Sequence, residues 1–257
     1  MNGAVRRAGR RAILGGMRAA PLVVAALLAS APVAYAQGQP AAPHEAAPGA
    51  IRVLLVGNSL TYSNDMPAML ERMAAAAGPK RLFVEFSGGP GMTLRQHWEA
   101  GAVARAAAER CWDCVVLQGQ SQEPVAATDE FLSYGQLLDG EIRRRGARTV
   151  LFVTWAARGQ SQAPLTAAYE SLARATGATV APVGAAWERA RRRGVTLHDA
   201  GGVHPNAAGT YLAACVLYAV VAGVSPVGLP FPSGPGMTPA FARELQETAW
   251  EAARASR

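Results

Sequence analysis

The chain has 257 residues and a formal net charge of +7; half of its residues are hydrophobic and 17% are charged. Removing the five arginines of residues 1–36 from the 25 basic residues leaves 20 against 18 acidic ones, so the positive charge belongs mainly to the amino-terminal segment. This balance excludes the concentrated basic stripe of a nucleic-acid-binding face, and no nucleic-acid partner is expected. Three cysteines are too few for a disulfide framework, although an oxidising compartment would allow a local Cys111–Cys114 bridge.

The amino terminus has the three-part layout of a secretory signal. Arginines precede an apolar run over residues 22–28, which is followed by a small-residue cleavage site at residues 34–36. We therefore predict a signal peptide over residues 1–36, a flexible leader over residues 37–49 and a single domain over residues 50–257. The mature protein is expected to be exported, either periplasmic or secreted. No transmembrane segment is expected in it, because no later stretch approaches the roughly 20 apolar residues of a spanning helix.

Short apolar runs alternate with helical patterns along the rest of the chain. The runs rich in Val, Leu and Phe predict strands covered on both faces, at residues 51–56, 82–86, 114–117, 149–154 and 178–183. Helices are predicted over residues 66–77, 93–110, 128–145, 164–176, 185–193 and 207–221. This order is typical of a three-layer α/β/α sandwich with a parallel sheet, in which active groups gather in the loops at the carboxyl ends of the strands.

Ser59 stands in the loop after the first predicted strand, where the sequence reads GNSLT over residues 57–61. A serine hydroxyl becomes a good nucleophile only when a base takes its proton. The candidate base is His204, which lies just before the helix predicted over residues 207–221. A turn or helix-capping serine is the alternative for Ser59 alone, but the pairing with His204 favours the nucleophile.

Four segments of the chain resemble the SGNH hydrolases, also called GDSL-like esterases and lipases, in order and approximate spacing. They are residues 53–61, 88–94, 115–124 and 204–214, and the first holds the GNSLT block of one branch of that family. The resemblance implies a flavodoxin-like SGNH hydrolase fold and hydrolysis of an ester through an acyl-serine intermediate, with no cofactor. The QGQS wording at residues 118–121 is similar to that of carbohydrate acetylesterases, so the expected substrate is a small-molecule or carbohydrate ester.

The resemblance also implies an oxyanion hole that includes the backbone N–H groups of Ser59 and of a glycine in the second segment. Gly91 is the matching glycine, and Gly89 is the second choice. A glycine lets the backbone approach the tetrahedral intermediate closely. A plain glycine-rich turn is the alternative.

The third segment departs from the family, because most members offer an asparagine amide where this chain has only glutamines. Gln118, Gln120 and Gln122 point to one face if the strand continues, and any of them would bring an amide N–H to the oxyanion. We favour Gln118 and then Gln120. A polar loop without catalytic contact is the alternative.

The acid of the triad is the second departure. The family usually has Asp three residues before the histidine, but that position is Gly201 here, and the nearest carboxylate is Asp199. The glycines at 201 and 202 give the loop the freedom to bring Asp199 to the His204 ring, so Asp199 is the predicted acid. A Ser–His pair whose ring is held by a backbone carbonyl is the alternative. His97 and His198 are expected to be surface or structural histidines.

Two other function classes compete with an esterase. A non-catalytic binding protein with the same fold would follow from loss of the usual acid at Gly201. A metal hydrolase is disfavoured, because His97, His198 and His204 form no ligand-spaced motif with a carboxylate. No metal and no cofactor are therefore expected.

Overall fold

Five parallel strands form one sheet in the computed structural model, which describes Met1, residues 46–77 and residues 80–256. Their bounds are β1 (Ile51–Gly57), β2 (Leu82–Gly88), β3 (Cys114–Leu117), β4 (Arg148–Phe152) and β5 (Thr179–Ala181). The spatial order is β2-β1-β3-β4-β5, and every neighbouring pair is parallel. This is the order of the flavodoxin-like doubly wound fold, so the predicted fold class is confirmed.

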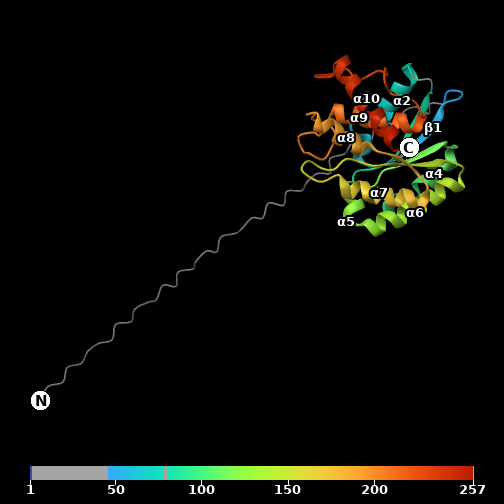
Figure 1. Ribbon diagram of the computed structural model, residues 1–257. Helices are drawn as coiled ribbons and strands as arrows, with labels where there is room; N and C mark the ends of the chain where they lie inside the picture. The colour runs from blue at the N-terminus through green and yellow to red at the C-terminus, as the bar shows by residue number, and fades with distance from the viewer. Residues whose placement is uncertain (2–45, 78–79, 257) are drawn as a thin grey trace. The chain divides into compact units, whose positions relative to one another are not determined.

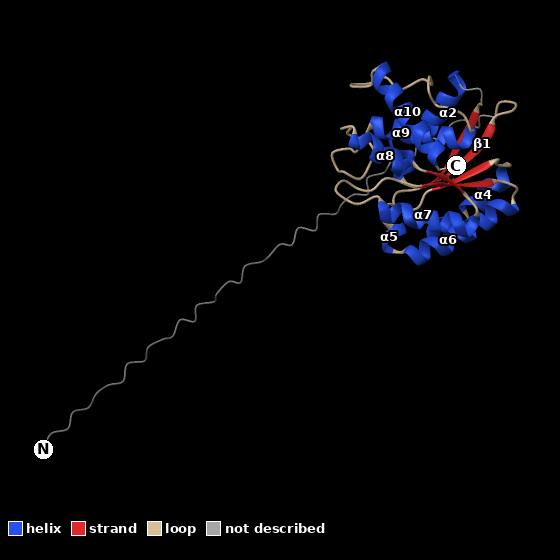
Figure 2. Cartoon of the chain, in the orientation of Figure 1, coloured by secondary structure: helices blue, strands red, loops and turns tan. Residues whose placement is uncertain are grey.

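Helices cover both faces of the sheet, as Figures 1 and 2 show. One layer holds α2 (Met66–Ala77), α8 (Val183–Arg192), α9 (Ala207–Ala222) and α10 (Pro239–Ala255). The other holds α3 (Leu94–Glu99), α4 (Ala102–Glu109), α5 (Glu123–Ala126), α6 (Thr128–Arg144) and α7 (Ala163–Thr176). Successive residues of β1 alternate between the two layers, with Leu55 packed in the first core and Leu54 in the second. A strand buried on both faces needs a continuous apolar run, which is what the sequence has.

The helix predicted over residues 93–110 is wrong as a single element. It is divided into α3 and α4, because Gly101 takes a left-handed φ of 61° that turns the chain between them. The strand predicted over residues 178–183 is also too long, since α8 already begins at Val183. The carboxyl-terminal helix α10, for which no range was predicted, packs against α8 and α9 in the first layer.

Residues 2–36 of the predicted signal peptide and residues 37–45 of the predicted leader lie outside the described residues. Within residues 46–77 and 80–256, no helix is both long and apolar enough to cross a membrane.

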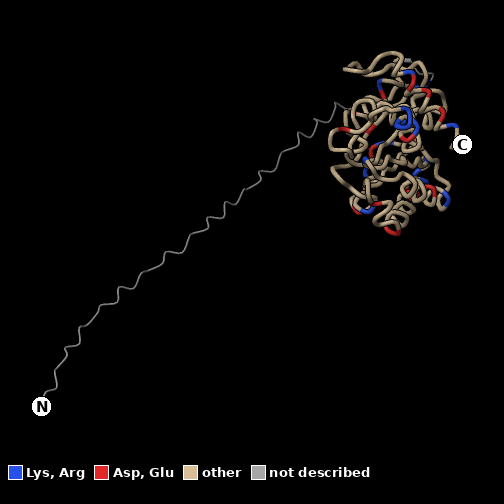
Figure 3. The backbone as a smooth tube through the Cα atoms, turned by 60° about the vertical axis from the view of Figure 1, so that its left-hand side comes forward, with Lys and Arg blue, Asp and Glu red and all other residues tan. Residues whose placement is uncertain are grey.

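The charged side chains are interspersed over the fold, and Figure 3 shows basic and acidic positions close to one another along the same segments. The basic cluster at residues 143–145 is paired on its own helix, with Arg143 2.9 Å from Asp139 and Arg145 2.9 Å from Glu141. A second basic cluster lies at residues 191–193, and there Arg193 donates to the Thr248 hydroxyl of α10 at 2.7 Å. These arginines therefore lie at helix ends, where they complement the helix dipole or contact a neighbouring helix.

Candidate active site

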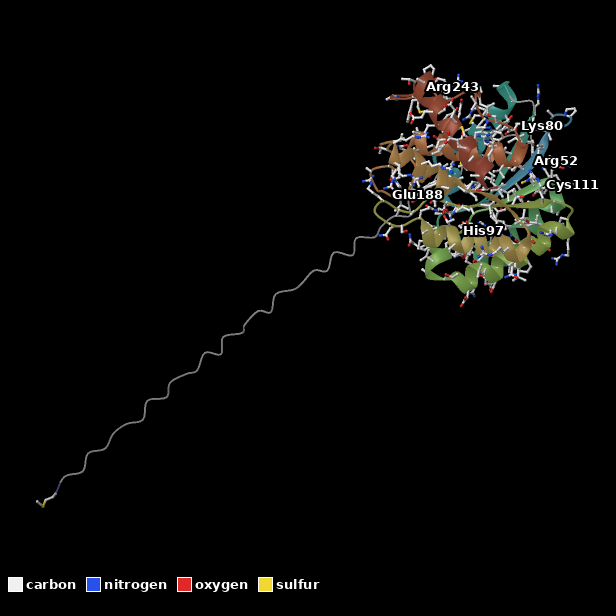
Figure 4. The ribbon with its side chains drawn as sticks, in the orientation of Figure 1. Arg52, Lys80, His97, Cys111, Glu188 and Arg243 are labelled. Atoms are coloured by element: carbon white, nitrogen blue, oxygen red, sulfur yellow. The ribbon has the colours of Figure 1, made fainter. Side chains whose placement is uncertain are left out.

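The strand order creates a switch point between β1 and β3. The chain passes from β1 to β2 on one side of this point and from β3 to β4 on the other. Arg52 and Cys111, both labelled in Figure 4, mark the amino ends of β1 and β3. The site lies at the other end of these strands. There Ser59 begins the short helix α1 (Ser59–Tyr62), with Asn58 as its N-cap.

Ser59 and His204 meet at this edge although 145 residues separate them. The Ser59 Oγ lies 2.9 Å from the His204 Nε2, within hydrogen-bond distance, and both side chains are partly buried. The N–H of Ser59 is the first of α1, a position that has no acceptor within its own helix. The hydroxyl therefore has a proton acceptor beside it, and an N–H group points out of the same turn.

Four consecutive carbonyl groups hold the loop that carries His204. The Gly202 carbonyl accepts from the Arg158 N–H at 2.8 Å, and the Val203 carbonyl accepts from the Trp155 indole N–H at 2.9 Å. The His204 carbonyl accepts from the Asp199 N–H at 2.9 Å, and the Pro205 carbonyl accepts from the side-chain amide of Asn64 at 3.0 Å. Trp155 and Arg158 belong to the loop after β4, Asn64 lies between α1 and α2, and Asp199 belongs to the histidine loop itself, so the position of His204 is set by two other segments as well as by its own loop.

An aromatic stack lies beneath this loop. Trp155 and Trp187 stack with ring centroids 4.0 Å apart and planes 4° apart, and His198 meets Trp187 edge-on at 4.8 Å. The His198 Nε2 lies 3.0 Å from the Ala156 carbonyl oxygen, and burial lowers the pKa of this imidazole. His198 therefore has the structural role expected from the sequence.

His97 is likewise structural. Its side chain is fully buried in α3, on the side of the sheet that holds α6 and α7 (Figure 4). Burial lowers the pKa of its imidazole to about 4, so the ring is neutral at physiological pH. It is not a surface residue.

Asp199 does not contact the His204 ring in the way the sequence predicts. Its Oδ1 accepts from the Gly202 N–H at 2.9 Å, which closes the turn over residues 199–202. Within the part of the chain that the structure describes, no hydrogen bond joins the Asp199 carboxylate to the His204 imidazole. This placement favours a turn-forming role, and the role of triad acid stays a prediction.

Gln118 supports the turn at residues 57–61, which carries Ser59 and is called the serine turn below. Its side chain is fully buried, and its Oε1 accepts from the Asn58 N–H at 2.8 Å and from the Thr61 hydroxyl at 2.9 Å. Its Nε2 donates to the Gly119 carbonyl. Because the amide oxygen, not the amide N–H, faces the serine turn, this geometry favours a supporting role over the predicted oxyanion role.

Gln120 is also engaged within its own loop. Its Oε1 accepts from the N–H groups of Gln122 at 2.7 Å and Glu123 at 3.1 Å, and its Nε2 donates to the Ser121 hydroxyl at 3.2 Å. The amide thus caps the start of α5, so its predicted part in the oxyanion hole has no support from these contacts.

Gly91 is the remaining predicted donor. It has a left-handed φ of 65°, it is exposed, and a side chain added there would meet no atom within 4 Å. Open space in front of its backbone is what close approach of a substrate oxygen requires. The neighbouring Gly89 accepts a turn hydrogen bond from the Met92 N–H at 3.4 Å through its carbonyl oxygen.

Asn58 and Glu123 join the three loops that surround Ser59, and neither residue was singled out from the sequence. The Asn58 Nδ2 donates to the Met92 carbonyl at 3.0 Å, and the buried Glu123 carboxylate accepts from the N–H groups of Leu94 at 2.9 Å and Gln120 at 2.8 Å. Burial raises the pKa of Glu123, while these two N–H donors act in the opposite direction. The signal that indicates Glu123 is its spacing three residues after Gln120, the spacing of a reciprocal helix cap.

The local bridge that an oxidising compartment would allow between Cys111 and Cys114 is not formed in the structure. Cys111 is exposed and free, and Cys114 is buried and free. Burial raises the pKa of the Cys114 thiol to about 11, so it is uncharged.

A search of solved structures finds several relatives of this arrangement. A protein from Slackia heliotrinireducens, provisionally classed as an SGNH hydrolase, is 31% identical, with 65% of this chain and 97% of that chain aligned at a TM-score of 0.55. A DUF4886 family protein from Bacteroides uniformis is 19% identical, with 79% and 94% aligned at a TM-score of 0.66. Axe2, an acetylxylan esterase from Geobacillus stearothermophilus, is 17% identical, with 70% and 97% aligned at a TM-score of 0.58.

A scan against protein-family models finds no match, and a search of curated proteins finds none either. The Slackia heliotrinireducens protein is similar over nearly its whole length, and the flavodoxin-like strand order agrees with that similarity. The chain belongs to the SGNH hydrolase family.

Proposed function

We propose that this hydrolase is an exported serine esterase, with Ser59 as nucleophile and His204 as general base. The observation that carries the proposal is the 2.9 Å separation between the Ser59 Oγ and the His204 Nε2. In the first half-reaction the Nε2 takes the hydroxyl proton as Oγ attacks the ester carbonyl. The tetrahedral intermediate then expels the alcohol, which receives that proton, and leaves an acyl-serine.

Water completes the cycle by the same steps. His204 takes a proton from a water molecule as the water oxygen attacks the acyl carbon, and the carboxylic acid departs when Ser59 regains its proton. The negative oxygen formed in each half needs N–H donors aimed at it. The N–H groups of Ser59 and Gly91 are the proposed donors, since one begins a helix and the other faces open space.

The proposed substrate is an acetylated carbohydrate or another small acyl ester. A hollow of about 110 Å³ lies between the loops that follow β3 and β4, and its lining residues carry no charge. Its polar side chains are those of Ser121, Gln122, Gln160 and Ser161, and its apolar residues are Val125, Ala156, Ala157, Pro164 and Leu165. Hydroxyl and amide groups of this kind suit a neutral, hydroxylated alcohol. The acetylxylan esterase activity of the Geobacillus stearothermophilus relative supports the same class of ester.

Hydrolysis of p-nitrophenyl acetate and of acetylated xylo-oligosaccharides tests the proposal. We expect the folded protein to turn over the nitrophenyl ester and to release acetate from the oligosaccharide. A folded protein that hydrolyses neither these esters nor other short-chain acyl esters would instead be a binding protein, the alternative that the sequence leaves open. The position of Ser59 beside His204 does not favour that alternative.

The substitution Asp199→Asn separates the two roles of Asp199. Asparagine keeps the oxygen that accepts from the Gly202 N–H, so we expect turnover to fall by less than about tenfold if the residue only closes the turn. A triad acid would instead lose about 10⁴-fold, because the imidazole would lose the partner that fixes its tautomer. Steady-state kinetics of the variant decide between them, and a loss near 10⁴-fold in a folded protein restores Asp199 as the acid.

Export is the last part of the proposal. The predicted cleavage after Ala36 makes Gln37 the first residue of the mature protein. Amino-terminal sequencing of protein recovered from the periplasm or the culture medium should therefore begin near Gln37. Recovery of the full chain, starting at Met1, from the cytosol alone would count against export.

A further inference from the structure

Asn64 lies between α1 and α2 in an unusual backbone conformation. Its φ is 53° and its ψ is 30°, in the left-handed region, and the next residue, Asp65, also has a positive φ of 55°. Residues other than glycine adopt this region at a cost, and asparagine is one of the few that tolerate it. Two such residues in succession need surrounding contacts that hold them there.

Those contacts lead directly to the loop of His204. The Asn64 Nδ2 donates to the Pro205 carbonyl at 3.0 Å and to the Thr210 hydroxyl at 2.8 Å, so both of its hydrogens are used. Pro205 directly follows His204, and Thr210 is buried in the first turn of α9. One amide group thus fixes both the histidine loop and the helix that follows it.

The other end of the same segment is tied to Ser59. The Ser59 carbonyl accepts from the N–H of Ser63 and from its hydroxyl, the latter at 2.6 Å. The residues from Ser59 to Ser63 therefore form a short helical turn that these two bonds hold together. Asn64 is the next residue, so the turn links Ser59 to the amide group that binds Pro205, the residue after His204.

From this geometry we infer that Asn64 is a positioning residue that sets the distance between the Ser59 Oγ and the His204 Nε2. The inference rests on the proposed esterase function. It has particular force here because no hydrogen bond from the Asp199 carboxylate to the His204 ring is found in the described residues, which leaves the loop contacts to hold the ring. The left-handed backbone aims the Asn64 amide across the site, a direction that a regular helix would not give it.

The test uses the pair Asn64→Gly and Asp65→Gly. Glycine keeps the left-handed conformation at both positions, but only the first variant loses the bonds to Pro205 and Thr210, because the Asp65 side chain is two-thirds exposed and pairs with Arg72 at 3.4 Å. We expect kcat of Asn64→Gly to fall about 10- to 100-fold, the effect of a small misplacement of reacting groups, with KM nearly unchanged. The rate at which a fluorophosphonate probe modifies Ser59 should fall in parallel, and Asp65→Gly should match the wild type in both measurements.

The second variant, Asn64→Asp, keeps the side-chain shape and turns an oxygen toward the Pro205 carbonyl, so the same loss of kcat and probe reactivity is expected. A folded Asn64→Gly or Asn64→Asp protein with kcat and probe reactivity within twofold of Asp65→Gly overturns the inference. An active wild type in that experiment shows that the esterase function stands without it. A wild type that neither hydrolyses esters nor reacts with the probe overturns the esterase function, and the inference falls with it.

Discussion

Replacing Ser59 with alanine is expected to lower ester hydrolysis by at least about 10³-fold, because the reaction then has no acceptor for the acyl group. The free energy of unfolding should change little, since the side chain is only partly buried and His204 is its hydrogen-bond partner. Rates of p-nitrophenyl acetate hydrolysis and urea denaturation midpoints measure the two quantities. Ser133→Ala, an exposed serine of α6, is the matched control and should retain full activity.

The same substitution combined with His204→Ala gives a sharper result. If the two side chains act as one unit, each single variant loses about as much activity as the double variant does. If the two side chains contributed independently, the fold-loss of activity in the double variant would be the product of the two single losses. Activity that survives Ser59→Ala in a folded protein would contradict the assignment of the nucleophile.

The second large effect is expected for Gly57→Ala, directly before the serine turn. A Cβ at this position would lie 2.6 Å from the Gln118 Oε1 and 2.6 Å from the Thr61 Oγ1, and these two atoms are hydrogen-bonded to each other. Both side chains are buried, so they have no free space to move into. We expect a loss of about 1–3 kcal/mol in the free energy of unfolding, the usual cost of overpacking. We also expect about 100-fold lower turnover, because the serine turn must shift.

Gly140→Ala provides the control for that prediction. Gly140 lies in α6, and a Cβ there would meet no atom within 4 Å, so its unfolding free energy should stay the same or rise. Denaturation curves and steady-state kinetics of both variants give the comparison. Equal stability and turnover for the Gly57 and Gly140 variants would show that the serine turn tolerates displacement.

The layers of the fold could be predicted because each strand is a separate, continuous apolar run that can be recognised in the sequence between two helical patterns. The break between α3 and α4 could not, since one glycine within a helical pattern is compatible with a continuous helix or with the left-handed turn that Gly101 makes. The apolar pattern also does not show where a strand such as β5 ends, because the run of apolar residues continues into the start of α8.

The pairing of Ser59 with His204 could be predicted from residue types and family resemblance, but the surrounding contacts could not. A glutamine amide both donates and accepts, and the sequence does not say which end of Gln118 faces the serine turn. The part played by Asn64 depends on a backbone angle that asparagine permits but does not require. Such contacts depend on where distant segments meet, and that becomes visible only in three dimensions.

The reactivity of Ser59 toward an active-site label tests the central claim most directly. A fluorophosphonate should form one covalent adduct per chain, located by peptide mass spectrometry on the peptide that contains Ser59, because the proposed general base, the His204 Nε2, lies 2.9 Å from that hydroxyl. The adduct should be absent from Ser59→Ala and should form far more slowly in His204→Ala. A folded wild-type protein that forms no adduct, or forms it on another serine, would contradict the account.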